Sequence, residues 1–94
     1  MVVFQIVVTA GFSRLLKKLT AKHPEIIDVY EKALGVLEVD PSNLTRRRNI
    51  RKLTDVKPGD GQWRIRVDDY RLRYDIEAPK VVLRSINDRK DAYR

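Results

Sequence analysis

Residues Gln62–Ile76 read QWRIRVDDYRLRYDI and contain two runs in which apolar and polar side chains alternate. An alternation with a period of two is typical of strands that are buried on one side. Asp68 and Asp69 lie between the two runs, so we predict a β-hairpin with a two-residue turn. The register that follows pairs Val67 with Tyr70, Arg66 with Arg71, Ile65 with Leu72 and Arg64 with Arg73.

The predicted hairpin has one apolar surface and one surface that carries four arginines. Like charges that face each other across a hairpin destabilise it by up to about 1 kcal/mol per pair. Guanidinium groups bind phosphate through paired hydrogen bonds and keep their charge at physiological pH, so two cross-strand arginine pairs favour a polyanionic ligand. The alternative is a solvated strand face whose charge is partly offset by Asp68, Asp69 and Asp75.

Length and composition limit what the chain can be. Its 94 residues predict one domain over residues 1–94, in which an active site would be a surface groove. The chain has no cysteine and one histidine, which excludes thiolate and multi-histidine metal sites, and we expect no metal or cofactor. It has no apolar run of about 20 residues and no signal-peptide pattern at its start, so we expect a cytoplasmic protein that does not bind membranes.

The net charge of +7 lies in the second half of the chain. The first 45 residues carry 5 Lys or Arg against 5 Asp or Glu, and residues 46–94 carry 15 against 8. This asymmetry is expected of a domain that binds nucleic acid with one surface.

Two helices are predicted between an N-terminal strand and the hairpin. Residues 2–8 are almost continuously apolar and predict a strand, after which Thr9 can cap a helix that ends near His23 and Pro24. A second helix is predicted over residues 24–38. The apolar stripes consist of Phe12, Leu15, Leu16 and Leu19 in the first helix, and of Ile27, Tyr30, Leu34 and Leu37, widened by Ile26 and Ala33, in the second.

Residues 43–61 predict a loop or a short irregular helix with a basic crest formed by Arg46, Arg47, Arg48, Arg51 and Lys52. After the hairpin, residues 81–86 predict a last strand. The resulting order, β-α-α-β-β-β, is an α+β fold in which a two-helix hairpin packs on one face of a small antiparallel sheet. The other face is basic and open.

Three segments together resemble the RelE/ParE toxin superfamily: Lys52-Leu53, GQWRIRVDDYRLRYDI from Gly61, and INDRKDAYR from Ile86. The resemblance covers nearly the whole chain and includes the order of the elements. RelE-like members cut messenger RNA in the ribosomal A site, and ParE-like members poison DNA gyrase with the same fold. For RelE-like chemistry the resemblance implies catalytic roles for Arg64, Arg66, Arg71, Arg89 and Tyr93.

This sequence departs from the family pattern at two places. Asn87-Asp88-Arg89 stands where many relatives have Gly-His-Arg, so an acid/base histidine is missing. Arg64 and Arg66 stand where RelE-like toxins often have lysine, and arginine is a poor general base. The proton donor and acceptor are therefore unassigned, with Asp88 as an outside candidate.

We therefore expect the toxin of a prokaryotic type II toxin-antitoxin system that is a metal-independent, ribosome-dependent endoribonuclease. The expected partners are an antitoxin protein, messenger RNA and the ribosome. Further RNA or ribosome contacts are expected from Arg46, Arg47, Arg48, Arg51, Lys52 and Arg73. The alternatives are a ParE-type gyrase inhibitor without RNase activity and a degenerate, inactive family member.

Overall fold

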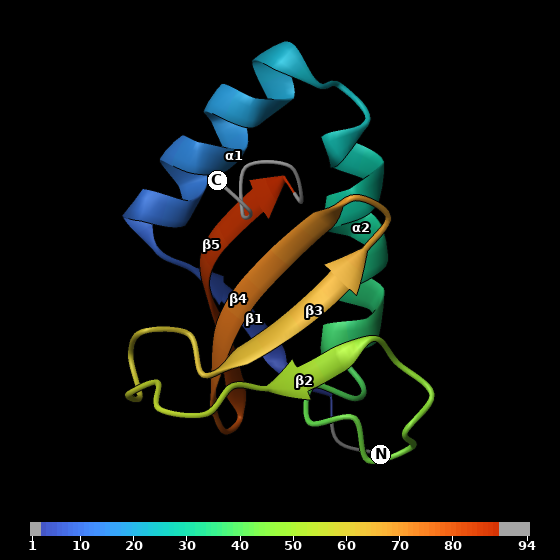
Figure 1. The fold of residues 1–94 in the computed structure, drawn as a ribbon, viewed down its shortest axis with the longest axis vertical. Helices are drawn as coiled ribbons and strands as arrows, with labels where there is room; N and C mark the ends of the chain where they lie inside the picture. The colour runs from blue at the N-terminus through green and yellow to red at the C-terminus, as the bar shows by residue number, and fades with distance from the viewer. Residues whose placement is uncertain (1–2, 89–94) are drawn as a thin grey trace.

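The computed structural model describes residues 3–88 of the chain. Two helices pack on one face of a five-stranded sheet (Figure 1). The elements in chain order are β1 (Gln5–Val8), α1 (Ala10–Lys22), α2 (Ile26–Leu37), β2 (Ile50–Lys52), β3 (Trp63–Val67), β4 (Tyr70–Glu77) and β5 (Lys80–Asp88). The predicted α+β class is confirmed.

The sheet has the strand order β1-β5-β4-β3-β2 and is mixed. β2, β3, β4 and β5 pair antiparallel with their neighbours, but β1 pairs parallel with β5, with Gln5 opposite Lys80 and Val8 opposite Leu83. The prediction of a purely antiparallel sheet was wrong in this respect. Because α1 and α2 both intervene after β1, the chain can return β5 to the side of β1 in the same direction.

The β3–β4 hairpin has the predicted register. Val67 lies opposite Tyr70, Arg66 opposite Arg71, and Arg64 opposite Arg73. Asp68, at the turn, has a positive φ of 53°, a backbone conformation that Asp tolerates better than most residues. The two-residue turn therefore fixes which side chains share a face.

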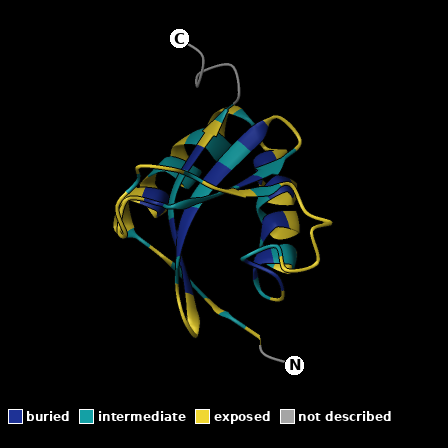
Figure 2. Ribbon diagram, turned by 60° about the horizontal axis from the view of Figure 1, so that its bottom comes forward, coloured by how far each residue is buried: buried dark blue, intermediate teal, exposed yellow. Residues whose placement is uncertain are grey.

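The core lies between the helices and the apolar face of the sheet. Thr9 caps α1 as predicted, because its hydroxyl accepts a hydrogen bond from the backbone N–H of Phe12 at 3.0 Å. In α2 the buried residues are Ile26, Val29, Ala33 and Leu37. The predicted stripe was wrong at Ile27, which is 51% exposed, because the buried face of α2 follows Ile26. Figure 2 shows the buried positions where helices and strands face one another, and exposed positions on the outer faces of the helices.

The connection between α2 and β3 contains a strand that was not predicted. Ile50–Lys52 forms β2 at the edge of the sheet, with Arg51 opposite Arg64. Hydrogen bonds from Leu53 N to Gln62 O and from Arg66 N to Asn49 O extend the pairing beyond both ends of β2. The segment is therefore more ordered than a loop, and it continues the basic face by one more strand.

Asp75 fixes the connection between β2 and β3. Its carboxylate is 3% exposed and accepts hydrogen bonds from the backbone N–H groups of Gly59, Gly61 and Gln62 at 2.9–3.1 Å. The register shift in β5 leaves Arg84 without an opposite residue in β4. Its side chain donates to the same Asp75 carboxylate at 2.8 Å. In the alternative of a solvated strand face, Asp75 would partly offset the hairpin arginines, but in the fold its charge is engaged by these amides and Arg84.

Candidate nucleic-acid interface

Arginines from three adjacent strands form two cross-strand rows on the sheet face opposite the helices. The first row runs Arg51–Arg64–Arg73 and ends at Ser85 of β5. The second row pairs Arg66 with Arg71 and ends at Asn87 of β5. On the other side of Arg66, its backbone N–H donates a hydrogen bond to the carbonyl of Asn49. We call this surface, made by Arg51, Arg64, Arg66, Arg71 and Arg73, the arginine face.

The arginines of this face differ in their surroundings. Arg51 is exposed, and the four arginines of the hairpin are half-buried. The guanidinium of Arg73 donates to the carbonyl of Gly61 through Nε and Nη2 at 3.1 and 3.0 Å, and to that of Asp60 at 2.9 Å. Arg73 therefore holds the β2–β3 connection against the sheet, in addition to its place in the first row.

The basic loop between α2 and β2 is held in shape by two side chains. Asp40 is 5% exposed and accepts hydrogen bonds from the backbone N–H of Leu44 at 2.7 Å and from the hydroxyl of Thr45 at 2.6 Å. Asn43 both accepts from the N–H of Arg48 and donates to its carbonyl, each at 3.1 Å. We call these two residues the loop clasp. Arg46, Arg47 and Arg48 are exposed on the loop that it shapes.

Lys52 lies apart from the arginine face. It is opposite Trp63 in the β2–β3 pairing, so it projects to the other side of the sheet from Arg51. Its ammonium group lies 5.6 Å from the centre of the Trp63 ring, in a cation–π arrangement. Of the basic residues predicted on residues 46–52, the structure thus brings Arg48 and Arg51 to the edge of the arginine face and turns Lys52 away.

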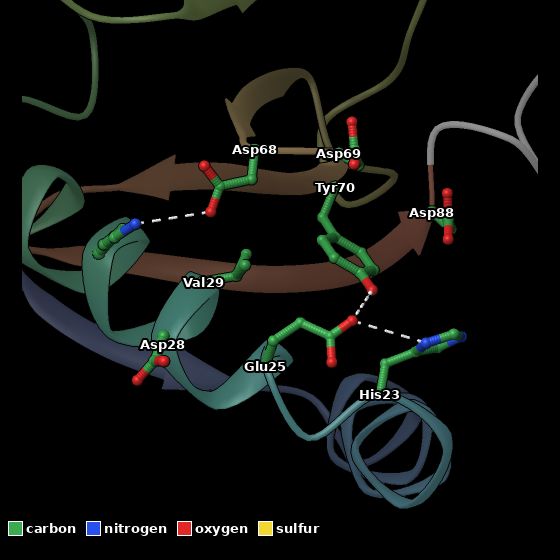
Figure 3. A pocket seen from close by; sticks show the side chains of 9 residues that line it. His23, Glu25, Asp28, Val29, Asp68, Asp69, Tyr70 and Asp88 are labelled. Carbon is green, nitrogen blue, oxygen red and sulfur yellow. Dashed lines mark hydrogen bonds and ion pairs between the residues drawn. The ribbon is translucent and has the colours of Figure 1, made fainter.

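An acidic hollow of about 360 Å³ lies at the hairpin turn, beyond the second row. The Tyr70 hydroxyl donates a hydrogen bond to Glu25 at 3.3 Å, and Figure 3 shows these two side chains pointing toward each other. Lys32 forms an ion pair with Asp68 at 3.5 Å. His23, the cap residue at the end of α1, lies 3.6 Å from Glu25. Asp88, at the end of β5 and opposite Tyr70, lines the same hollow. The predicted residues Arg89 and Tyr93 lie outside the described residues.

The shifted pKa values in this region belong to groups that support the structure. Burial and the nearby Glu25 carboxylate raise the pKa of Tyr70 to about 12, so its hydroxyl stays protonated and remains a donor. The Thr45 hydroxyl and the Leu44 and Thr45 amides hold the pKa of Asp40 below its ordinary value, against the opposing effect of burial. The arginines supply permanent positive charge, so the arginine face can bind and stabilise phosphate charge without a metal ion.

Among residues 3–88, no group of three or more His, Cys, Asp or Glu side chains is arranged to hold a metal ion. Neither of the two described helices has the length and apolar character that crossing a lipid bilayer requires.

Sequence reasoning did not identify the loop clasp or Asn49. Asp40 follows the predicted second helix and Asn43 begins the predicted loop, and neither was given a role, because the partners that give them one lie in an irregular loop. The one available signal was two residues that favour capping and turns, Asp40 and Asn43, in the short stretch before the run of arginines that begins at Arg46.

Residues 6–93 match the family described as the ParE toxin of the type II toxin-antitoxin system, parDE. The fold is similar to that of YafQ from E. coli, with a TM-score of 0.69, 15% identity, and 97% of this chain and 99% of that chain covered. It is also similar to a chain of the RelB–RelE antitoxin-toxin complex from Methanococcus jannaschii, with a TM-score of 0.59, 19% identity, and 93% and 94% covered. The archaeal RelE–RelB complex from Pyrococcus horikoshii gives a TM-score of 0.58, 17% identity, and 95% and 97% covered. No curated protein sequence matches the chain.

Proposed function

The chain belongs to the ParE toxin family, within the RelE/ParE superfamily, and is the toxin of a type II toxin-antitoxin system; from this premise we propose that it is an endoribonuclease that cleaves messenger RNA in the ribosomal A site. The observation that carries the proposal is the pair of arginine rows, in which Arg66 faces Arg71 and Arg64 faces Arg73. A fold that needed only stability would gain from opposite charges at these positions.

Metal-independent cleavage of RNA begins when the 2′-hydroxyl attacks the adjacent phosphorus and displaces the 5′-oxygen of the next nucleotide. Negative charge then develops on the non-bridging phosphate oxygens, where preorganised cations can each lower the barrier by several kcal/mol. Arg71 lies in the centre of the sheet on β4, and we assign it to this role together with Arg89. Arg64 and Arg66 on the neighbouring strand position the RNA backbone.

The proton transfers need groups other than the arginines. One group must take the proton from the 2′-hydroxyl, and another must give a proton to the departing 5′-oxygen. We assign Tyr93 to stacking on a base or to one of these transfers. Asp88, the outside candidate for the base, lies opposite Tyr70 and lines the acidic hollow beside the helices, so it faces the other side of the sheet from Arg71. The ribosome can complete the geometry, in keeping with the A-site activity of RelE-like toxins.

The proposed partners are messenger RNA, the ribosome and an antitoxin protein. Arg46, Arg47, Arg48 and Arg51 extend the positive surface from the arginine face along the basic loop, which supports contacts with RNA on the ribosome. Lys52 can join these contacts only from the opposite side of the sheet edge. Two of the structural neighbours were solved as complexes with an antitoxin, which supports an antitoxin as the partner that silences this chain.

A second candidate is a ParE-type inhibitor of DNA gyrase, a function that requires binding and no RNA chemistry. The family match itself favours it, because the matching family is the ParE toxin. The positive surface would then contact gyrase or its DNA.

The two candidates are separated by supplying the purified toxin to programmed ribosomes and, in parallel, to a gyrase supercoiling assay. We expect codon-phased cuts in the translated message and no effect on supercoiling, and we expect Arg71→Gln to abolish the cuts. Inhibited gyrase with intact messages would replace the proposal by the second candidate. The absence of both effects would identify a degenerate, inactive member.

A further inference from the structure

A small hollow of about 180 Å³ lies at the edge of the arginine face, between the basic loop and β3. Its lining is strongly basic and consists of Arg48, Asn49, Ile50, Arg51, Arg64 and Arg66. Four of these six residues carry a guanidinium group, and none is acidic. Clefts that hold a whole small molecule measure about 300–1,000 Å³, so this hollow is suited to a single anionic group.

The backbone around this hollow is fixed from two sides. On the sheet side, Arg66 N donates to Asn49 O at 2.9 Å, and Ile50 and Arg51 pair with Ile65 and Arg64. On the loop side, the Asn43 side chain bonds both the N–H and the carbonyl of Arg48, and also reaches the carbonyl of Ile50 at 3.4 Å. The backbone of residues 48–51 therefore does not need to be ordered by a ligand, which lowers the free-energy cost of binding.

The loop clasp includes one acidic residue that pairs with an arginine of the hollow. Asp40 forms an ion pair with Arg48 Nε at 3.9 Å, and its side chain is 5% exposed. It takes hydrogen bonds from Leu44 and Thr45, which places its charge on the core side of the loop. Asp40 therefore offsets part of the charge of Arg48 only, and Arg51, Arg64 and Arg66 can act together with it on an anion. The Asn49 carboxamide adds a neutral hydrogen-bond donor.

We propose that this hollow is a preformed pocket for one phosphate group of single-stranded RNA, separate from the phosphate bound at Arg71. Arg51 on β2, at the outer side of the pocket, lies two strand spacings, or about 10 Å, from β4 and Arg71, with Arg64 and Arg66 of β3 between them. A phosphate at this outer side and the phosphate at Arg71 therefore belong to different nucleotides. The assignment to RNA rests on the proposed endoribonuclease function, whereas the phosphate pocket itself does not.

The test is an NMR titration of the full-length protein with inorganic phosphate at constant ionic strength. We expect saturable shifts of the backbone amides of residues 48–51 and 64–66. Arg48→Gln removes one exposed cation from the pocket and should weaken binding at least tenfold. Asn43→Gly keeps the charge and, because Asn43 has a φ of 56°, also keeps the backbone conformation, while it removes the three hydrogen bonds of the clasp. It should weaken binding to a similar extent.

Lys57→Gln is the matched control, because Lys57 is exposed and lies outside the lining of the pocket. It removes the same charge as Arg48→Gln and should leave phosphate binding unchanged. If Lys57→Gln weakens binding as much as Arg48→Gln, the attraction is diffuse and the pocket is overturned. Unchanged binding by a folded Asn43→Gly variant would likewise show that the pocket is not preformed.

The outcome for the pocket can be told apart from the outcome for the proposed function. Saturable phosphate binding without any cleavage on programmed ribosomes would leave the pocket in place and end the endoribonuclease proposal. Cleavage without saturable phosphate binding would overturn the pocket alone. If both hold, a trinucleotide should bind more tightly than inorganic phosphate to the unmodified protein, and Arg48→Gln should reduce this difference.

Discussion

Asp75 is a single residue that holds the β2–β3 connection in place beside the arginine face. Its buried carboxylate receives three backbone N–H groups and Arg84, which in turn bonds Glu77 at 3.0 Å. We expect Asp75→Ala to lower the free energy of unfolding by roughly 3 kcal/mol or more, because it leaves buried donors and a charged partner without their acceptor. Urea denaturation checks this. Asp60→Ala, an exposed change in the same connection, is the control and should have little effect; equal effects of the two changes would contradict the role of Asp75.

Arg71 is a residue at which stability and function should separate. Because Arg66 lies directly opposite, Arg71→Gln should be neutral or stabilise the fold by up to about 1 kcal/mol at low salt, and the gain should shrink as salt screens the repulsion. Cleavage on programmed ribosomes should fall by orders of magnitude. Denaturation at two salt concentrations beside the cleavage assay measures both. A strong loss of stability, with activity that only follows the folded fraction, would make Arg71 a structural residue.

Among the elements, the β2–β3 connection contains two glycines that allow a direct comparison. Gly59 and Gly61 have φ values of 97° and 81°, but only Gly61 faces a close neighbour, since an added Cβ would lie 2.9 Å from Cβ of Arg73. Gly59→Ala should cost about 1–2 kcal/mol from backbone strain, and Gly61→Ala should cost more because it adds a steric clash. Thermal denaturation of the two variants measures the difference. A loss at Gly59 equal to that at Gly61 would mean that the packing against Arg73 contributes nothing.

The elements also show what the sequence could and could not predict. The register of the β3–β4 hairpin was predictable because a two-residue turn and strict alternation leave one pairing. β1 was predicted as a strand, but a short apolar run does not indicate which neighbour it joins or in which direction. β2 escaped prediction because two of its three residues are charged and the strand is too short to show a period.

The candidate site was predictable where strands form it and not where irregular loops form it. The four arginines of the hairpin follow directly from alternation, and their common face is confirmed. The second role of Arg73 and the clasp at Asp40 and Asn43 depend on backbone groups of irregular loops, to which periodicity gives no access. Lys52 was predicted with its basic neighbours, although the alternation of β2 turns it to the other face.

For the molecule as a whole, two buried carboxylates make stability depend on pH in the acid range. Asp75 is buried, which raises its pKa, but hydrogen bonds from Gln62, Arg84 and Gly61 outweigh this, and the pKa is held below its ordinary value of 3.8. The pKa of Asp40 is also lowered. The folded state therefore binds fewer protons than the unfolded state, so this stability is fully present above the unfolded pKa and is lost as the pH falls through the folded pKa values.

We expect the contribution of Asp40 and Asp75 to the urea midpoint to be constant between pH 5 and pH 7. It should fall on acidification below about pH 4. The Asp75→Asn variant has no ionisable group at this position, so it should be less stable at neutral pH. It should also lose less stability on acidification. A variant with the same pH dependence as the unmodified protein would assign the acid sensitivity to other carboxylates.

Within residues 3–88, the parallel pairing of β1 with β5 joins the first strand to the last. Gln5 lies opposite Lys80, and Val8 opposite Leu83, so the sheet cannot be completed until the final strand has been synthesised. Chains grow from the N-terminus at about 5–20 residues per second, and β1 therefore waits for its partner for roughly 4–15 seconds. Until then the arginine rows lack β5 beside them, so the toxin acquires its complete sheet only after β5 has left the ribosome.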